Sequence, residues 1–337
     1  MTRKAIYLVL ALSLLLTLIS GCASSASPTP TAAKPAAAAT AAPAGAATKA
    51  SAPAGKRYQL ALIVKNLVNP VWISMKTEAE RAAKELGVDV VTMAPTKPDN
   101  VEEQLRMVED LIQKKVDAII LVPADSKAIV PGIEKANAAG IPVINVNTKA
   151  YGGKTVTFVS SDNVAAGKMS AEFAIKAIGG KGKAIILEGV PAAQTAEDVK
   201  KGFMEALAAN PGVTLLASQT ANFLRAQGQS VTENLLQRYP DVDLILSAND
   251  EMAMGALQAI DAAGKSGKIK VASIDATKDG IKAVADGRML VTVDKALGLQ
   301  GYEGVKAAVR YLKGEKVDDV IFLQLQLIDQ AKAKTMQ

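Results

Sequence analysis

The segment Gln59–Leu86, QLALIVKNLVNPVWISMKTEAERAAKEL, contains the strand-to-helix transition on which the fold prediction rests. It opens with a nearly continuous apolar run over Gln59–Lys65, which is typical of a parallel strand covered on both faces. Asn69-Pro70 then provides a helix N-cap followed by proline at the first helical position, and Gly87 stands where the helix should end. The segment therefore predicts a buried strand followed by a helix over Val71–Leu86.

The same alternation of short apolar runs and amphipathic stretches continues towards the C-terminus. After a strand at Val156–Val159 the rhythm restarts with a helix at Asn163–Ile178. A further helix is expected at Glu197–Ala208, Asp250 is a plausible N-cap for another, and the series ends with a strand at Val320–Leu325. Two successive series of this kind predict an α/β fold with two Rossmann-like, doubly wound parallel-sheet lobes. A single (β/α)₈ barrel is the competing arrangement at this length.

Two absences in the composition narrow the chemistry. The chain of 337 residues contains no histidine, which excludes His-based acid/base catalysis and nearly every zinc site. Its single cysteine, Cys22, lies before the expected folded region, which excludes disulfides and cysteine nucleophiles. We therefore expect neither a metal nor a cofactor.

The net charge of +6 belongs to the N-terminus. Six basic residues and no acidic ones precede Tyr58, which leaves 33 basic and 33 acidic residues in the remainder. A neutral folded part does not favour a nucleic-acid partner.

The first 22 residues resemble a bacterial lipoprotein signal peptide. A basic start precedes an apolar run over Ala5–Ile19, which is short for a membrane-spanning helix, and the tetrapeptide Ile19-Ser20-Gly21-Cys22 resembles a lipobox. We expect Cys22 to be lipidated and to become the mature N-terminus, which would hold the protein on the outer face of the cell membrane or in the periplasm. The alternatives are an uncleaved anchor and a chance cysteine.

Residues 23–57 are rich in alanine, proline, serine and threonine and contain no leucine, isoleucine, valine or phenylalanine. Such a segment has no core to bury, so we expect a disordered tether.

Polar residues follow several of the predicted strands. In open α/β sheets ligands bind beyond the carboxyl ends of the strands, where helix caps and turn formers are also common. The only tryptophan, Trp72, either fills the core under a helix start or presents a flat apolar face to a sugar ring. The positions at predicted strand ends, or at the start of the helix that follows, are Lys65, Asn69, Trp72, Asn147, Thr148, Glu188, Asn249, Asp250, Asp275, Asp294 and Lys295. Together these side chains resemble a carbohydrate-recognition set.

Several ordered motifs resemble the ribose/allose type of periplasmic sugar-binding proteins that feed ABC importers. The resemblance runs from about Tyr58 to Leu327, and its motifs are Leu62–Leu86 (quoted above within Gln59–Leu86), SSDNVAAG at Ser160–Gly167, LEGVPAAQTAE at Leu187–Glu197, SANDEMAMGAL at Ser247–Leu257 and SIDATKDG at Ser273–Gly280. It implies the type I periplasmic-binding-protein fold, in which a three-strand hinge joins two lobes that close on a sugar. The implied lobes are 58–160 plus 296–323 and 161–295 plus 324–337.

The resemblance also implies a set of ligand contacts. Position by position, these fall on Lys65, Asn69, Val71, Trp72, Asn147, Thr148, Glu197, Phe223, Asn249, Asp275 and Lys295. Lys65 with Glu197 is closer to the allose-type branch than to the ribose-type branch.

The chain departs from the family pattern at four of these positions. The family typically has an aromatic residue at Val71, a carboxylate at Asn147, a charged residue at Thr148 and glutamine at Lys295. Lys295 beside Lys65 indicates either an acidic or otherwise modified sugar, or two lysines that balance Glu197 and Asp275.

We therefore expect a lipid-anchored, non-enzymatic solute-binding protein that takes up a small sugar or polyol. Its expected partners are an ABC permease with its ATPase and the membrane, and it is expected to be a monomer. A ligand receptor for chemotaxis or quorum-type sensing is the alternative, and a sugar-active enzyme such as a glycosidase is a more remote one.

Overall fold

A computed structural model describes residues 57–337 of the chain. The predicted signal peptide at 1–22, the predicted lipidation site Cys22 and all but the last residue of the predicted tether at 23–57 lie outside the described residues.

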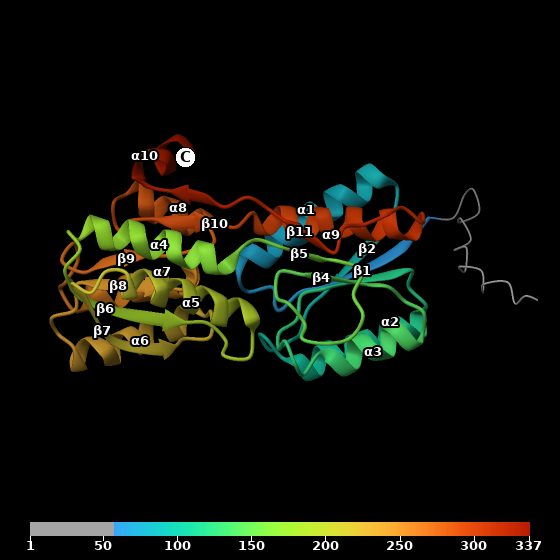
Figure 1. The fold of residues 1–337 in the computed structure, drawn as a ribbon, viewed down its shortest axis with the longest axis horizontal. Coiled ribbons are helices and arrows are strands. Elements are labelled where there is room, and N and C mark those ends of the chain that lie inside the picture. Colours follow the sequence, from blue (N-terminus) through green and yellow to red (C-terminus); the bar gives the residue numbers. More distant parts are fainter. Residues whose placement is uncertain (1–56) are drawn as a thin grey trace, which may run out of the picture. The chain divides into compact units, whose positions relative to one another are not determined.

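The first lobe is built on a six-stranded parallel sheet with the order β11-β5-β4-β3-β1-β2. Helices α1 and α9 cover one face of this sheet, and α2 and α3 cover the other (Figure 1). The strands are β1 (Gln59–Ile63), β2 (Asp89–Met93), β3 (Ala118–Leu121), β4 (Val143–Val146), β5 (Phe158–Ser160) and β11 (Val320–Phe322). The helices are α1 (Pro70–Leu86), α2 (Val101–Lys114), α3 (Val130–Ala138) and α9 (Leu297–Leu312).

The second lobe contains a four-stranded parallel sheet with the order β7-β6-β8-β9 and a two-stranded antiparallel pair, β10-β12. Its strands are β6 (Gly182–Glu188), β7 (Val213–Thr220), β8 (Leu244–Ser247), β9 (Lys270–Ala272), β10 (Thr292–Asp294) and β12 (Gln326–Ile328). Its helices are α4 (Asn163–Ala177), α5 (Gln194–Ala208), α6 (Arg225–Arg238), α7 (Asp250–Ala262), α8 (Lys278–Ala285) and α10 (Gln330–Thr335). Two separate open sheets exclude the barrel alternative and match the predicted type I fold.

The chain passes three times between the two sheets. It leaves β5 of the first lobe at Ser160 and begins α4 at Asn163, returns from β10 to α9 between Asp294 and Leu297, and runs from β11 to β12 between Phe322 and Gln326. These crossovers make both lobes discontinuous in sequence.

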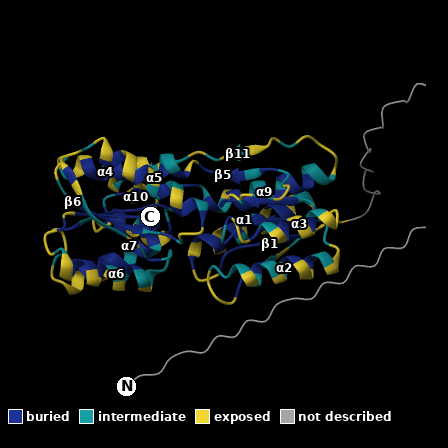
Figure 2. Cartoon of the chain, turned by 60° about the horizontal axis from the view of Figure 1, so that its bottom comes forward, coloured by how far each residue is buried: buried dark blue, intermediate teal, exposed yellow. Residues whose placement is uncertain are grey.

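Strand β1 shows how the apolar runs create two cores. Leu60 and Leu62 lie in the cluster formed with α1 and α9, whereas Ala61 and Ile63 lie in the cluster formed with α2 and α3. Successive side chains of a strand point to opposite faces, so a strand buried on both faces is apolar throughout. Figure 2 shows buried strands between helices whose outer faces are exposed.

Helices α4 and α5 pack closely because glycines face each other's backbone. A Cβ atom on Gly167 would lie 2.3 Å from the Val199 carbonyl oxygen, and one on Gly202 would lie 2.1 Å from the Val164 carbonyl oxygen. Any side chain at either position would separate the two helices.

Most predicted elements form, with three informative differences. Asn249, not Asp250, is the N-cap of α7, since its side chain accepts from the Met252 amide. Helix α5 begins at Gln194 instead of Glu197. The single strand expected at Val320–Leu325 is instead β11, and the unpredicted β12 and α10 follow it, because these short exposed segments depend on pairing with β10 and packing on α8.

Candidate functional site

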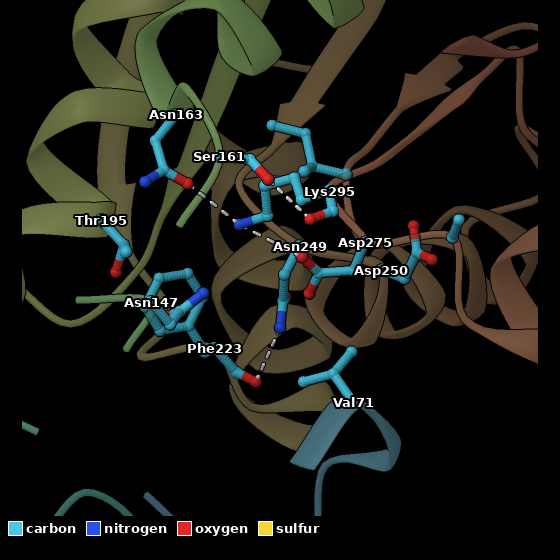
Figure 3. Close-up of polar contacts among 12 residues, drawn as sticks. Val71, Asn147, Ser161, Asn163, Thr195, Phe223, Asn249, Asp250, Asp275 and Lys295 are labelled. Atoms are coloured by element: carbon cyan, nitrogen blue, oxygen red, sulfur yellow. Dashed lines mark hydrogen bonds and ion pairs between the residues drawn. The ribbon is translucent and has the colours of Figure 1, made fainter. Parts of the chain in front are cut away.

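A cavity lies between the two lobes. Nearly all of its lining residues follow the carboxyl ends of strands or begin helices, as expected for an open α/β sheet. The lining residues are Lys65, Asn66, Asn69, Val71, Trp72, Asp99, Asn147, Thr195, Phe223, Asn249, Asp275, Lys295 and Leu297. Figure 3 shows most of the second-lobe side chains converging on this space.

Lys65 follows β1 and is 2% exposed. Its ammonium lies 5.8 Å from the ring centroids of both Trp72 and Phe223, one ring from each lobe. Among residues 57–337 this ammonium makes no ion pair and no hydrogen bond. Burial, partly offset by the charge of Asp99, lowers the pKa of Lys65 to about 8.

Asn69 illustrates how a helix start supplies a ligand-facing group. Its side-chain oxygen accepts from the Val71 amide at 3.2 Å and caps α1, as predicted. Asn66 holds the same turn, since its oxygen accepts from the Asn69 amide at 3.0 Å. The side-chain nitrogen of Asn69 makes no hydrogen bond within the described part of the chain, and Asn69 lines the cavity.

The second-lobe residue Asn249 is bound at both ends of its amide. Its oxygen accepts from the Met252 amide at 2.9 Å, and its nitrogen donates to the Phe223 carbonyl at 3.2 Å (Figure 3). These contacts tie the Phe223 backbone to the start of α7. The position of Phe223 therefore depends on a hydrogen bond as well as on side-chain packing.

Asp275 and Lys295 form a buried ion pair. The Lys295 ammonium lies 3.4 Å from a carboxylate oxygen of Asp275, and each side chain is 7% exposed. Lys295 also donates to the side-chain oxygen of Asn163 at 3.3 Å. Burial raises the pKa of Asp275 to about 6, although the charge of Lys295 opposes this shift.

Asp250 supports the loop that carries Asp275 but does not line the cavity. Its fully buried carboxylate accepts from the Thr277 amide at 2.7 Å, the Thr277 hydroxyl at 3.0 Å and the Thr292 hydroxyl at 2.8 Å. Burial, reinforced by the charge of Asp275, raises the pKa of Asp250 to about 7. Asp250 is therefore a positioning residue.

Backbone strain concentrates at the cavity. Asn147, Phe223 and Asp275 have φ angles of 63°, 58° and 116°, and the lining residue Asp99 has a φ of 57°. Left-handed conformations of residues other than glycine cost about 1–3 kcal/mol each and persist where the surroundings enforce them. The fold thus uses strained backbone to aim these side chains inwards.

A hydrogen-bonded network connects the cavity to the crossovers. The Asn147 side-chain nitrogen donates to the Gln300 side-chain oxygen at 3.2 Å, and the Gln300 nitrogen donates to the Lys295 carbonyl at 3.0 Å. Ser161 donates to the same carbonyl at 2.7 Å. Fully buried Gln300 on α9 therefore joins a cavity residue to two of the three crossover segments.

Direct contacts also join the two lobes beside the cavity. The Ser126 amide donates to the Ala192 carbonyl at 2.9 Å, and the Tyr151 hydroxyl donates to the Glu197 carboxylate at 2.9 Å. The hydroxyls of Thr148 and Thr195 lie 3.3 Å apart. The structure therefore has its lobes in contact around the site.

Most of the predicted ligand contacts line the cavity, but two do not. Thr148 is fully buried just behind Asn147, to whose side-chain oxygen it donates at 3.2 Å. Glu197 is exposed and bound to Tyr151 outside the cavity. Because α5 begins at Gln194, Thr195 faces the cavity and Glu197 lies about 200° further around the helix.

Four lining residues were not predicted: Asn66, Asp99, Thr195 and Leu297. Asn66 lies one residue beyond Lys65 in a predicted turn, so strand-end logic could have included it. Asp99 lies in a loop before α2, and no pattern in the sequence indicates that this loop folds back so that the Asp99 amide donates to the Lys65 carbonyl at 3.1 Å.

Within the part of the chain that the structure describes, no three or more cysteine or carboxylate side chains gather as a metal site. None of the helices in residues 57–337 combines the length and apolar character needed to cross a bilayer.

Comparison with protein families shows a match of residues 60–316 to the periplasmic binding protein domain. The ribose import binding protein of Escherichia coli (strain K12) is 37% identical over 278 residues, which cover 82% of this chain and 93% of that protein. The D-allose-binding periplasmic protein of the same organism is 36% identical over 267 residues, covering 77% of this chain and 86% of that protein.

Solved structures share the fold. A periplasmic solute-binding protein of an ABC transporter from Actinobacillus succinogenes 130z, with bound D-allose, superposes with a TM-score of 0.79 at 34% identity, covering 83% of this chain and 100% of that chain. A solute-binding protein from Bacillus halodurans C-125 with bound myo-inositol has a TM-score of 0.78 at 26% identity, covering 83% and 97% of the two chains.

Proposed function

The chain belongs to the family of periplasmic binding protein domains, and from this premise we propose that it binds a monosaccharide-sized polyol between its two lobes and presents it to an ABC permease. Like its relatives, it is a solute-binding protein of the extracytoplasmic space and not an enzyme. The observation that carries the proposal is the inter-lobe cavity, to which both lobes contribute polar groups and one aromatic ring each.

The chemistry of the cavity fits a polyol. Trp72 and Phe223 offer flat apolar faces to the C–H groups of a sugar ring, and Asp275 and Asn249 offer carboxylate and amide groups to its hydroxyls. The names of the relatives include ribose, D-allose and myo-inositol, which are all uncharged and rich in hydroxyls. We assign this chain the polyol class and no single one of these compounds.

Closure of the lobes is the proposed binding step. The contacts between Ser126 and Ala192 and between Tyr151 and Glu197 form only when the lobes meet. A ligand that touches both lobes favours this closed state by its differential affinity for it. The moving bodies that we propose are 58–160 plus 296–323 and 161–295 plus 324–337, in line with the crossovers after Ser160, Asp294 and Phe322.

Thermal-shift measurements test the proposal. Dialysed protein is mixed with pentoses, hexoses, polyols and sugar acids, and at least one compound should raise the Tm, because a ligand that binds only the native state stabilises it by mass action. The Asp275→Asn variant should show no such rise with the same compound. A complete panel without a shift in the unmodified protein would contradict the proposed function.

We further propose that the protein is tethered to the membrane by lipid on Cys22. The support is the apolar run over Ala5–Ile19 followed by Ser20-Gly21-Cys22 and a long segment without large apolar residues. Full-length protein from expressing cells should partition into the detergent phase of Triton X-114. The Cys22→Ser variant should partition into the aqueous phase, and equal partitioning of the two proteins would contradict the anchor.

A further inference from the structure

The polar groups of the cavity differ in how many of their possible hydrogen bonds and ion pairs are formed within the protein. The Lys65 ammonium has three N–H donors and, within residues 57–337, no hydrogen-bond acceptor. The side-chain nitrogen of Asn69 adds two donors without a partner in the same described range. The first-lobe wall of the cavity therefore presents donors that need acceptor oxygens from a ligand.

On the second-lobe wall, the charges are paired and most hydrogen-bonding groups already have partners within the protein. Asp275 pairs with Lys295 at 3.4 Å, so these two charges balance each other. Asn249 uses its oxygen and one N–H on the Met252 amide and the Phe223 carbonyl. What remains for a ligand is mainly the second carboxylate oxygen of Asp275, which accepts a hydrogen bond from a hydroxyl.

Neither carboxylate that the sequence offers as a partner neutralises Lys65. Glu197 is bound to Tyr151 outside the cavity, and Asp275 is taken by Lys295. Asp99 acts on Lys65 through its charge, but it forms no ion pair with Lys65 within 4.0 Å, and its side chain accepts instead from Asn66. Asp99 therefore supplies neither a hydrogen-bond acceptor nor a close ion-pair partner to the Lys65 ammonium.

We propose that the ligand of this cavity is a polyol that bears one carboxylate, such as an aldonic or uronic acid, and that this carboxylate binds Lys65 and Asn69. This inference rests on the proposed function and narrows it to a class of ligand. A buried ammonium is unfavourable without a partner, and a carboxylate supplies both the missing charge and the missing acceptors. One unpaired cation matches one negative charge, whereas a phosphate ester would bring up to two.

The rest of such a ligand has its own contacts. Its hydroxyls face Asp275 and Asn249, and the rings of Trp72 and Phe223, both 5.8 Å from the Lys65 ammonium, cover its apolar C–H groups. The acid group is thus directed to the first lobe and the hydroxyl groups to the second.

Matched pairs of ligands test the inference by isothermal titration calorimetry at pH 7. Dialysed protein is titrated with D-ribose and D-ribonate, D-allose and D-allonate, D-glucose and D-glucuronate, and D-galactose and D-galacturonate. The acid of at least one pair should bind 10-fold or more tightly than its neutral partner. In Lys65→Gln, which keeps a donor but removes the charge, this preference should fall to about 1. The Lys114→Gln variant changes an exposed lysine on α2 and should retain it.

The two possible failures are distinguishable. If neutral sugars bind as tightly as or more tightly than their acids, or if Lys65→Gln keeps the preference for the acid, the inference is wrong and the proposed function stands. If neither member of any pair binds and the broader thermal-shift panel is also silent, the proposed function fails and the inference fails with it.

Discussion

On the second-lobe side of the cavity, Asp275 holds the Lys295 ammonium at 3.4 Å, and Asn249 is bound at both ends of its amide. On the first-lobe side, Lys65 touches two aromatic rings and no acceptor in the described chain. The second-lobe wall is therefore pre-organised by contacts within the protein, whereas the first-lobe wall holds an unpaired charge for the ligand. The two walls should respond to mutation with opposite effects on stability.

The largest effect is expected from Asp275→Ala. Ligand affinity should fall by about 100-fold or more, because a charge-assisted hydrogen bond to the ligand is lost. The free energy of unfolding should also fall by about 2–4 kcal/mol, since Lys295 is left buried and unpaired. Calorimetric titration and urea unfolding measure the two quantities.

The double variant Asp275→Ala/Lys295→Met separates these two losses. It should recover most of the stability, because no unpaired charge remains, and none of the affinity. Full stability of the single variant would contradict the view that Lys295 depends on Asp275.

Lys65→Met should change stability in the opposite direction. The ligand-free protein should gain about 1 kcal/mol of unfolding free energy, because methionine fills a similar volume without a buried charge. Ligand affinity should fall by roughly 10–100-fold. Urea unfolding with and without ligand provides both numbers, and a loss of stability in the ligand-free variant would place Lys65 among residues that hold the fold.

Gln300→Leu tests the connection between the walls. Affinity should fall about 10-fold, since Asn147 and the carbonyl of Lys295 lose their shared partner while the cavity keeps its own side chains. Small-angle scattering with saturating ligand should show a smaller contraction than in the unmodified protein.

The matched control is Gln104→Leu. Gln104 is also a fully buried glutamine, but its side chain bonds only within the first lobe, to Val64, Val122 and Ala124. Gln104→Leu should lower the free energy of unfolding by a similar amount and leave the ligand-induced contraction normal. Equal contraction in both variants would show that Gln300 has no role in the hinge.

The buried acids of the second lobe predict a dependence of stability on pH. The folded-state pKa values of Asp275 and Asp250 are about 6 and about 7, above the ordinary value of 3.8. At pH 5 the folded state therefore binds more protons than the unfolded state. The free energy of unfolding falls as the pH rises through 6 and 7 and the folded state releases these protons. The Tm of the ligand-free protein should be several degrees higher at pH 5 than at pH 8.

Asp241→Asn is the control for this measurement. The exposed Asp241 carboxyl has a lowered pKa and stays ionised over the whole range, so the variant should show the same difference between pH 5 and pH 8. A Tm that rises from pH 5 to pH 8 would contradict the assignment of raised pKa values.

The smallest effect is expected from Tyr151→Phe, which removes one exposed contact between the lobes. An exposed hydrogen bond to a carboxylate contributes about 0.5 kcal/mol, so affinity should fall two- to threefold. Stability without ligand should hardly change. Stopped-flow binding should place the loss in the dissociation rate, and an unchanged dissociation rate would show that this contact does not hold the lobes together.

Much of the site was predictable because parallel strands bring their carboxyl ends to one edge of a sheet. Lys65, Asn147, Asn249, Asp275 and Lys295 were all expected on this ground, and all line the cavity. Glu197 was expected among the ligand contacts by resemblance, but in the structure it lies outside the cavity. The first turn of α5 decides which of its residues face inwards, and that turn begins three residues before Glu197. A shift of this size rotates a side chain to another face of a helix.

The sequence by itself determined the two-lobed α/β architecture, since alternating apolar runs and capped amphipathic helices admit few other arrangements. It also determined the absence of histidine and the exclusion of the chemistry that needs it. Only the tertiary structure decided how the charges pair. The sequence left two lysines and two carboxylates in several possible combinations, and contacts between residues 20 or more positions apart tie Asp275 to Lys295 and Glu197 to Tyr151. Lys65 is left for a ligand because pairing depends on distance in space, which no local pattern specifies.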